Sequence, residues 1–375
     1  MTRIRGAVLE RVGDAEPWSK STPITVDVLE LDEPGPGEVE VRMEAAGVCH
    51  SDLSRVNGNR EVVVPMLLGH EGSGTVVRCG PDTDGVAVGD RVVMTFLPIC
   101  GTCEACTSPG WALCSRGSAA NARGEMLGGG RRLRWRGGPI DHHGGVSAFA
   151  TRAIVDVASL VVVPPEVPAD VAALLGCAVL TGGGAVLNAG GLKPGESVAV
   201  VGLGGVGFAA MMVAASAEPS AVLAVDVLPG KLTRAGGFGA TRSLTPQEAV
   251  AADARYDLVV ECTGNVRALE TAIALTRPGG RTVTVGLPHP STQLTISPLS
   301  LVTEARSLIG SYLGSGDPAE DIRRYAALYL EGRLPLDKLI TGHIALADIN
   351  KAMDDLHAGS VLRQIIDLAK EQEPA

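Results

Sequence analysis

The chain has 375 residues, 45% of them hydrophobic, and a formal net charge of −10. This length exceeds one ordinary core and predicts about two globular domains. The acidic excess argues against a nucleic-acid partner, which needs clustered Lys and Arg. No run of about 18 apolar residues is free of a charge, glycine or proline, so we expect no membrane span. Without a signal peptide or secretory apolar region, the sequence favours a cytoplasmic protein with reduced thiols.

Short β-like runs bounded by turn residues fill the chain from residue 4 to about residue 156. Strands that follow one another without intervening helices predict an antiparallel, barrel-like domain. The expected strands are Ile24–Leu29, Glu38–Met43, Gly74–Arg78 and Arg91–Met94.

Three dispersed segments of this half carry candidate metal ligands. The runs Cys49–Asp52 (CHSD) and Gly69–Glu71 (GHE) each follow an apolar strand pattern, and Cys177 lies in the apolar run 172–180. Alone, a buried cysteine is usually a small hydrophobe and a buried histidine a hydrogen-bonded core residue. Together, two cysteines and a histidine form a known ligand set of catalytic zinc, which keeps its fourth position open.

A second group of cysteines lies close together in the sequence. Four of the chain's eight cysteines fall within fifteen residues, at Cys100, Cys103, Cys106 and Cys114. Thiolates at this spacing in a loop can complete a tetrahedral zinc shell, which leaves no room for substrate and is therefore structural. A pair of disulfides is the alternative, and the expected reducing compartment disfavours it.

One basic run, Arg131–Arg136 (RRLRWR), interrupts the acidic chain. It could form an RNA-binding patch, but it is short and flanked by glycines. A solvated loop whose arginines pair with carboxylates is the favoured interpretation.

The predicted pattern of secondary structure changes after about residue 180. Short apolar runs alternate with helix-length segments such as 208–217 and 266–275, a pattern typical of a parallel sheet covered on both faces. The expected strands are Ser197–Val201, Ala221–Asp226, Asp257–Cys262 and Arg281–Val285.

The first of these strands leads into a glycine-rich loop. Gly202-x-Gly204-Gly205-Val206-Gly207 stands between the strand and an Ala-rich helical pattern, the arrangement of a dinucleotide-binding turn. Asp226 lies nineteen residues past Gly207, where a carboxylate accepts the ribose hydroxyls of NAD and repels the 2′-phosphate of NADP. In the alternative interpretation, the glycines serve only packing and the aspartate caps a helix. This interpretation does not explain why a strand, a loop, a helix and an acidic residue occur in this order and at this spacing. We therefore predict a doubly wound NAD-binding domain over residues 179–311.

Two helical patterns, 317–330 and 346–359, and a closing strand, 364–368, follow without a further strand–helix repeat. We assign them to the first domain, which then comprises residues 1–178 and 312–375.

These motifs together resemble the zinc-containing medium-chain alcohol dehydrogenases over nearly the whole chain. The segment from Arg123 to His143 resembles the longer loop of the animal-type enzymes and their formaldehyde-oxidising relatives. The resemblance implies a GroES-like β-barrel catalytic domain, a Rossmann domain, and two zinc ions and one NAD per chain.

The resemblance also implies roles for individual residues. Cys49, His70 and Cys177 would bind the catalytic zinc, with Asp52 behind them and Glu71 either behind them or as a transient ligand. Ser51 would take the alcohol proton and pass it through the cofactor ribose and His50. The further residues implied to bind the cofactor are Lys231, Gly286, Leu287 and Arg363.

The chain departs from the family pattern in three respects. His50 replaces an arginine found in many relatives, and Ser54 stands where a relay histidine often ends the proton path. The matching substrate-channel positions hold Phe96, Leu287, Arg60 and His143. Arg60 and His143 favour a substrate with a polar or anionic tail.

The expected activity is hydride transfer between NAD and an alcohol/aldehyde or alcohol/ketone pair, in a homodimer or homotetramer. Within the enzymes, oxidation of a thiol–formaldehyde adduct is the alternative. The alternatives that are not enzymes are a nucleotide-sensing or zinc-stabilised scaffold and a zinc-ribbon nucleic-acid binder. A scaffold has no need for an open zinc site beside a hydroxyl, and the acidic charge opposes the nucleic-acid binder.

Overall fold

The computed structural model describes residues 1–108 and 112–374, and the chain divides into two compact units. The first unit comprises Met1–Cys177, Ile322–Leu330 and Ile340–Ala375, and the second comprises Ala178–Asp321 and Glu331–Leu339. The predicted first boundary lies one residue later than the observed one, and the predicted second boundary lies ten residues earlier. The return of residues 331–339 to the second unit was not anticipated.

The first unit contains two sheets whose strands pair mostly antiparallel, as predicted. One sheet has the order β8-β7-β2-β1-β4-β9, with bounds Gly138–Pro139, Leu133–Trp135, Ile24–Leu31, Thr2–Leu9, Met66–Leu67 and Asp141–His142. The other has the order β11-β6-β5-β3-β19-β18, with bounds Leu160–Val162, Arg91–Met94, Gly72–Cys79, Glu38–Val48, Arg363–Asp367 and Ile340–Ile344. Strand β10 (Arg152–Asp156) also pairs with β3.

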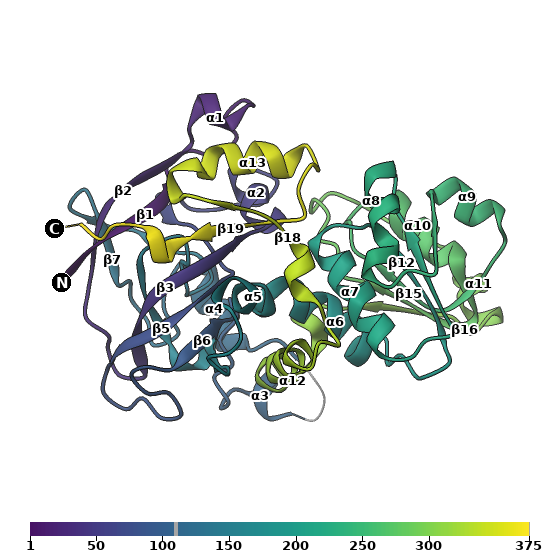
Figure 1. The fold of residues 1–375 in the computed structure, drawn as a ribbon, viewed down its shortest axis with the longest axis horizontal. Coiled ribbons are helices and arrows are strands. Elements are labelled where there is room, and N and C mark those ends of the chain that lie inside the picture. The colour runs from purple at the N-terminus through teal and green to yellow at the C-terminus, as the bar shows by residue number, and fades with distance from the viewer. Residues whose placement is uncertain (109–111, 375) are drawn as a thin grey trace. The chain divides into compact units, whose positions relative to one another are not determined.

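The first unit also contains short helices, which connect the strands (Figure 1). They are α1 (Trp18–Ser21), α2 (His50–Val56), α3 (Glu104–Thr107), α4 (Ser115–Ala122), α5 (Ala169–Leu174) and α13 (Ile349–His357). The expected helix over 346–359 is α13 preceded by a 3-10 turn, and the expected strand over 364–368 is β19.

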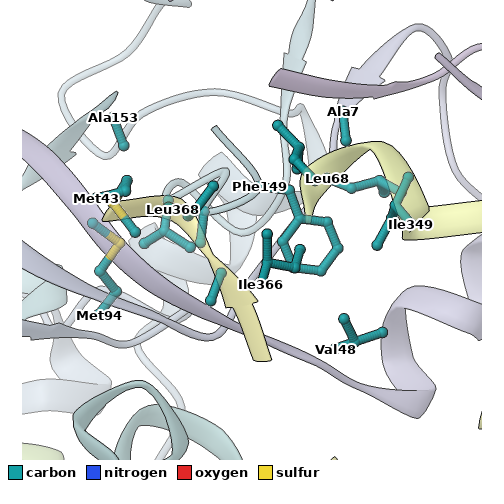
Figure 2. Packing of buried hydrophobic residues seen from close by; sticks show 14 of the residues in the cluster. Ala7, Met43, Val48, Leu68, Met94, Phe149, Ala153, Ile349, Ile366 and Leu368 are labelled. Carbon is teal, nitrogen blue, oxygen red and sulfur yellow. The ribbon is translucent and has the colours of Figure 1, made fainter. Parts of the chain in front are cut away.

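The C-terminal segment completes the core of the first unit. Figure 2 shows the Phe149 ring beside Leu68 and Ile366, with Ile349 near them. Ile366 comes from β19 and Ile349 from α13, and all four side chains are buried. Because burial of apolar surface is the main driving force of folding, this packing holds residues 340–374 to the N-terminal strands.

The basic run 131–136 is not a loop, because Leu133–Trp135 form β7. Its arginines do have the carboxylate partners that we predicted. Arg131 pairs with Asp141 at 2.7 Å, Arg132 with Glu38 at 2.7 Å and Arg136 with Glu10 at 3.0 Å.

The second unit is built on a six-stranded parallel sheet, as the alternation of strands and helices predicted. Its order is β14-β13-β12-β15-β16-β17, with bounds Arg242–Leu244, Ala221–Val225, Ser197–Val201, Tyr256–Glu261, Thr276–Thr284 and Ser307–Gly310. The helices assigned wholly to this unit are α6 (Leu180–Gly184), α7 (Gly205–Ser216), α8 (Pro229–Ala235), α9 (Pro246–Ala251), α10 (Val266–Leu275) and α11 (Pro298–Thr303). The remaining helix, α12 (Pro318–Leu330), has residues in both units.

One helical run, Ala169–Ala189, is long and apolar enough to cross a membrane by length and composition alone. Its most apolar window is 83% buried within the fold. A buried core helix of a globular protein gives the same signal, so this run does not indicate a membrane protein.

Candidate active site

Four side chains from three distant segments meet in the first unit. One ligand atom from each of Cys49, His70, Glu71 and Cys177 lies within 4.8 Å of the others, and all four residues are buried. Cys49 precedes α2, the His70–Glu71 pair lies between β4 and β5, and Cys177 follows α5. The Cys177 Sγ lies 3.6 Å from the Nε2 atom of His70.

A glycine allows Cys177 to reach this position. A Cβ atom on Gly176 would lie 2.0 Å from the Met94 carbonyl oxygen, so only glycine lets the helical segment approach β6 this closely. The sequence thus places Cys177 against the sheet that carries Cys49.

Asp52 orients two of the candidate ligands. Its Oδ1 lies 3.0 Å from His70 Nδ1, and its Oδ2 accepts the Cys49 backbone N–H at 3.0 Å. An imidazole that donates from Nδ1 to a carboxylate presents Nε2 as a metal ligand, the arrangement found behind zinc-bound histidines. The hydrogen bond from Cys177 lowers the pKa of Cys49 well below its usual value, and the charges of Arg363 and His70 act in the same direction. The site therefore favours the thiolate that zinc requires.

Glu71 and Arg363 lie behind this cluster. The Arg363 Nη2 lies 3.4 Å from Glu71 Oε1, and neither Glu71 oxygen has a hydrogen-bond partner among the described residues. Burial raises the pKa of Glu71 to about 8, although the Arg363 charge opposes this effect. Buried oxygens without partners beside two thiols fit a site that receives a cation. Arg363, predicted to bind the cofactor, is 3% exposed and directed at Glu71.

The residues predicted for the substrate channel are in different environments. His143 is 3% exposed, its ring centroid lies 5.0 Å from that of His70, and its Nδ1 lies 3.4 Å from Asp52 Oδ1. Phe96 meets the His70 ring edge-on, with the centroids 5.4 Å apart. Arg60 is half-buried, and Leu287, in the second unit, is 49% exposed.

Arg55, which was not predicted from the sequence, fixes the tautomer of His143. The Arg55 Nε donates to His143 Nε2 at 2.8 Å, and a guanidinium can only donate. His143 is therefore neutral with its proton on Nδ1, and burial, followed by the charge of Arg55, lowers its pKa well below the usual value. Arg55 lies one helical turn after Ser51 in α2, but that spacing alone gave no signal of a partner in residues 137–147.

Ser51 and His50 open α2 directly after Cys49. Ser51 is half-buried and His50 is exposed. This position places a hydroxyl two residues from a candidate metal ligand.

The four cysteines close in sequence form the second cluster. Their sulfur atoms are within 4.8 Å of one another, with Cys103–Cys106 at 3.4 Å and Cys103–Cys114 at 3.9 Å. A hydrogen bond from Ser115 lowers the pKa of Cys103 to about 5, whereas burial raises that of Cys106 to about 12. All eight cysteines are free thiols, so the disulfide alternative is not observed. Four sulfurs at these distances fit one tetrahedral zinc.

Replacing Cys103 by alanine is expected to remove one zinc per chain and lower Tm by more than about 5 °C, because zinc binding at such sites is coupled to folding. Metal analysis and thermal unfolding measure both effects. Cys79→Ala, at a half-buried cysteine of β5 outside both clusters, is the matched control and should keep two zincs. Loss of activity in a Cys103 variant that melts normally would contradict this assignment.

The glycine-rich turn lies at the carboxyl end of β12, and α7 begins at Gly205. Asp226 follows the last residue of β13 and is 8% exposed. It accepts backbone N–H groups from Leu203 at 2.7 Å and Leu228 at 2.9 Å, and Lys231 Nζ lies 3.9 Å from it. The carboxylate is therefore held at the end of the strand next to the turn, as a ribose-binding acid must be.

A parallel-sheet domain with a glycine-rich turn, and a unit with one cluster of two cysteines and a histidine and another of four cysteines, define the class of zinc- and dinucleotide-dependent dehydrogenases. Residues 35–165 match the family described as alcohol dehydrogenase GroES-like domain, and residues 205–331 match the family described as zinc-binding dehydrogenase. The class-3 alcohol dehydrogenases of Myxine glutinosa and Caenorhabditis elegans are each 33% identical, over 94% of this chain and 96% of each relative. The benzyl alcohol dehydrogenase structure from Acinetobacter calcoaceticus is 30% identical, with a TM-score of 0.90 over 98% of this chain and 99% of its own.

The chain belongs to the zinc-dependent medium-chain alcohol dehydrogenase family. The predicted fold, a GroES-like catalytic domain with a Rossmann domain, is thereby confirmed. The protein is an NAD(P)-linked zinc oxidoreductase of the alcohol/aldehyde class that acts on small molecules, and the scaffold alternative is set aside.

Proposed function

We propose that Cys49, His70 and Cys177 bind the catalytic zinc, and that the protein oxidises a small alcohol with NAD. The observation that carries this proposal is the meeting of two thiols and an imidazole nitrogen in a buried cluster beside Asp52. Bound there, zinc would supply a Lewis acid that lowers the pKa of an alcohol hydroxyl, and NAD would supply the hydride acceptor. Cys100, Cys103, Cys106 and Cys114 hold the structural zinc.

The chain's own residues handle the proton and the orientation of the ligands. Ser51 Oγ accepts the hydroxyl proton as it releases its own proton towards His50, which is exposed at the start of α2 and passes a proton on to solvent. Hydride transfer from the carbinol carbon to bound NAD would leave an aldehyde or ketone as the product. Asp52 orients the His70 ring so that its Nε2 would be available to the metal, and Glu71 would lie behind the ligands or bind the metal transiently.

A second candidate activity is oxidation of a thiol–formaldehyde adduct. It is supported by Arg60, whose guanidinium has no partner among the described residues and suits an anionic substrate tail. The similarity to class-3 enzymes favours it as well. We expect a cytoplasmic homodimer or homotetramer for either activity.

The test is NADH formation across a panel of alcohols, with and without formaldehyde plus a low-molecular-weight thiol. Turnover of simple or aromatic alcohols without the thiol supports the first activity. Turnover that requires both formaldehyde and the thiol supports the second.

NAD is expected to be preferred over NADP because Asp226 would repel the 2′-phosphate. Asp226→Gly should raise the KM for NAD by about 10-fold and narrow the gap to NADP, since it removes both the ribose acceptor and the repulsion. Initial rates with the two cofactors measure this change. Asp253→Gly, at an exposed aspartate with φ 50° in the same unit, is the control and should alter neither KM. A wild type that uses NADP as well as NAD would disprove the role of Asp226.

A further inference from the structure

A buried carboxylate at the end of β15 connects several turns of the second unit. Glu261 is 1% exposed and is the last residue of that strand. Its Oε1 accepts the Thr263 N–H at 2.6 Å, the Thr263 hydroxyl at 2.5 Å and the Gly264 N–H at 2.9 Å. Its Oε2 accepts the Thr284 hydroxyl, at the end of β16, at 2.8 Å.

No cation pairs with Glu261 in the described part of the chain. A buried carboxylate is costly unless hydrogen bonds replace its lost hydration, so these four donors must be held in place. In turn, the carboxylate fixes the two segments that supply the donors, 263–264 and the end of β16.

Both segments pack directly against the predicted nucleotide turns. A Cβ atom on Gly202, the first glycine of the glycine-rich turn, would lie 2.2 Å from Thr263 Cγ2. A Cβ atom on Gly286 would lie 1.9 Å from the Gly264 backbone nitrogen. The turns after β12, β15 and β16 are therefore in contact with no space between them, and a shift of Thr263 or Gly264 must move the others.

These turns lie at the carboxyl edge of a parallel sheet, where open α/β folds bind dinucleotides. We propose that Glu261 is a positioning residue for the cofactor: its carboxylate fixes the turns at 202–207, 263–264 and 285–288 in the arrangement that binds NAD. The inference rests on the proposed use of NAD by this domain. Glu261 does not touch the reacting atoms and acts through the turns alone.

The test compares Glu261→Ala with Glu261→Gln by fluorescence titration of NADH, with thermal unfolding measured in parallel. Alanine leaves four donors without an acceptor and should raise the NADH Kd by at least about 10-fold. Glutamine should stay within about 3-fold of wild type, because its oxygen can serve the three donors at Oε1 and Thr284 can accept from its amide. At saturating NAD, kcat of the alanine variant should change far less than KM.

Asp257→Ala is the matched control for lost stability. Asp257 lies near the opposite end of the same strand, where its Oδ2 accepts the Ser197 N–H at 2.8 Å and the Ser197 hydroxyl at 2.6 Å. This variant should lower Tm and leave the NADH Kd unchanged. Equal Kd values for Glu261→Ala and wild type, or equal Kd increases for the Glu261→Ala and Asp257→Ala variants, would overturn the inference.

If Glu261→Ala does not fold, Thr284→Val provides the test, since it removes one donor to Glu261 and keeps the side-chain shape. It should raise the NADH Kd by about 2- to 5-fold, and an unchanged Kd would count against the role of Glu261. A wild type that does not bind NADH at all would overturn the proposed NAD site and this inference together.

Discussion

Cys177→Ala is expected to give a folded protein with one zinc per chain and a turnover reduced by more than about 100-fold. Loss of residues that only support zinc ligands costs about 10- to 100-fold in metal affinity or activity, and loss of a ligand should cost more. The alanine also leaves His70 Nε2 without the sulfur that lies 3.6 Å from it. Metal analysis, thermal unfolding and steady-state NADH formation measure the three effects.

Cys79→Ala again serves as the control and should keep both zincs and full turnover. The Cys177 variant should retain NADH binding, because the nucleotide turns belong to the other unit. Full activity in Cys177→Ala would rule out the proposed ligand set. A variant that fails to fold would instead give this cysteine a structural role.

The sequence predicts best what depends on neighbours along the chain. Cys100 to Cys114 lie within fifteen residues at a spacing typical of structural zinc sites, and the structure brings their sulfurs together. The Gly202–Gly207 turn was predictable for a similar reason, since a strand, a turn and a helix in register fix its geometry. Asp226 shows the usual error at an element boundary. The predicted strand ended with Asp226, whereas the observed strand β13 ends one residue earlier.

The candidate catalytic cluster could not be derived from spacing. His70 and Cys177 are 107 residues apart, so their approach depends on the whole first unit. Only the chemistry of a two-cysteine, one-histidine zinc site and the family resemblance linked them in advance. Glu261 and Arg55 were missed for a related reason. The partner of Glu261 in β16 becomes apparent only once β16 has been placed beside β15. The partner of Arg55 becomes apparent only once the 137–147 segment has been placed beside α2.

Ser51→Ala is expected to reduce turnover by about 100-fold or more, the usual scale for a positioned proton-transfer group. Both zincs and NADH affinity should survive, because the variant removes only a hydroxyl from the first turn of α2. The difference in turnover between Ser51→Ala and wild type should become smaller as the pH is raised from about 7 to about 10, since hydroxide can then take the alcohol proton in place of Ser51. Pre-steady-state NADH formation across this pH range separates the chemical step from product release.

Two variants of the same helix decide between a proton-transfer role and a turn-capping role for Ser51, since a hydroxyl here could merely cap the turn. Ser51→Thr keeps the hydroxyl and should retain substantial turnover. Ser54→Ala removes a hydroxyl one turn later, which donates to the His50 carbonyl at 2.9 Å, and should stay within about 3-fold of wild type. Equal turnover for the alanine and threonine variants of Ser51 would show that the proton leaves by another route. His50 would then be the first residue to test, because it is the exposed titratable group that precedes Ser51 in the chain.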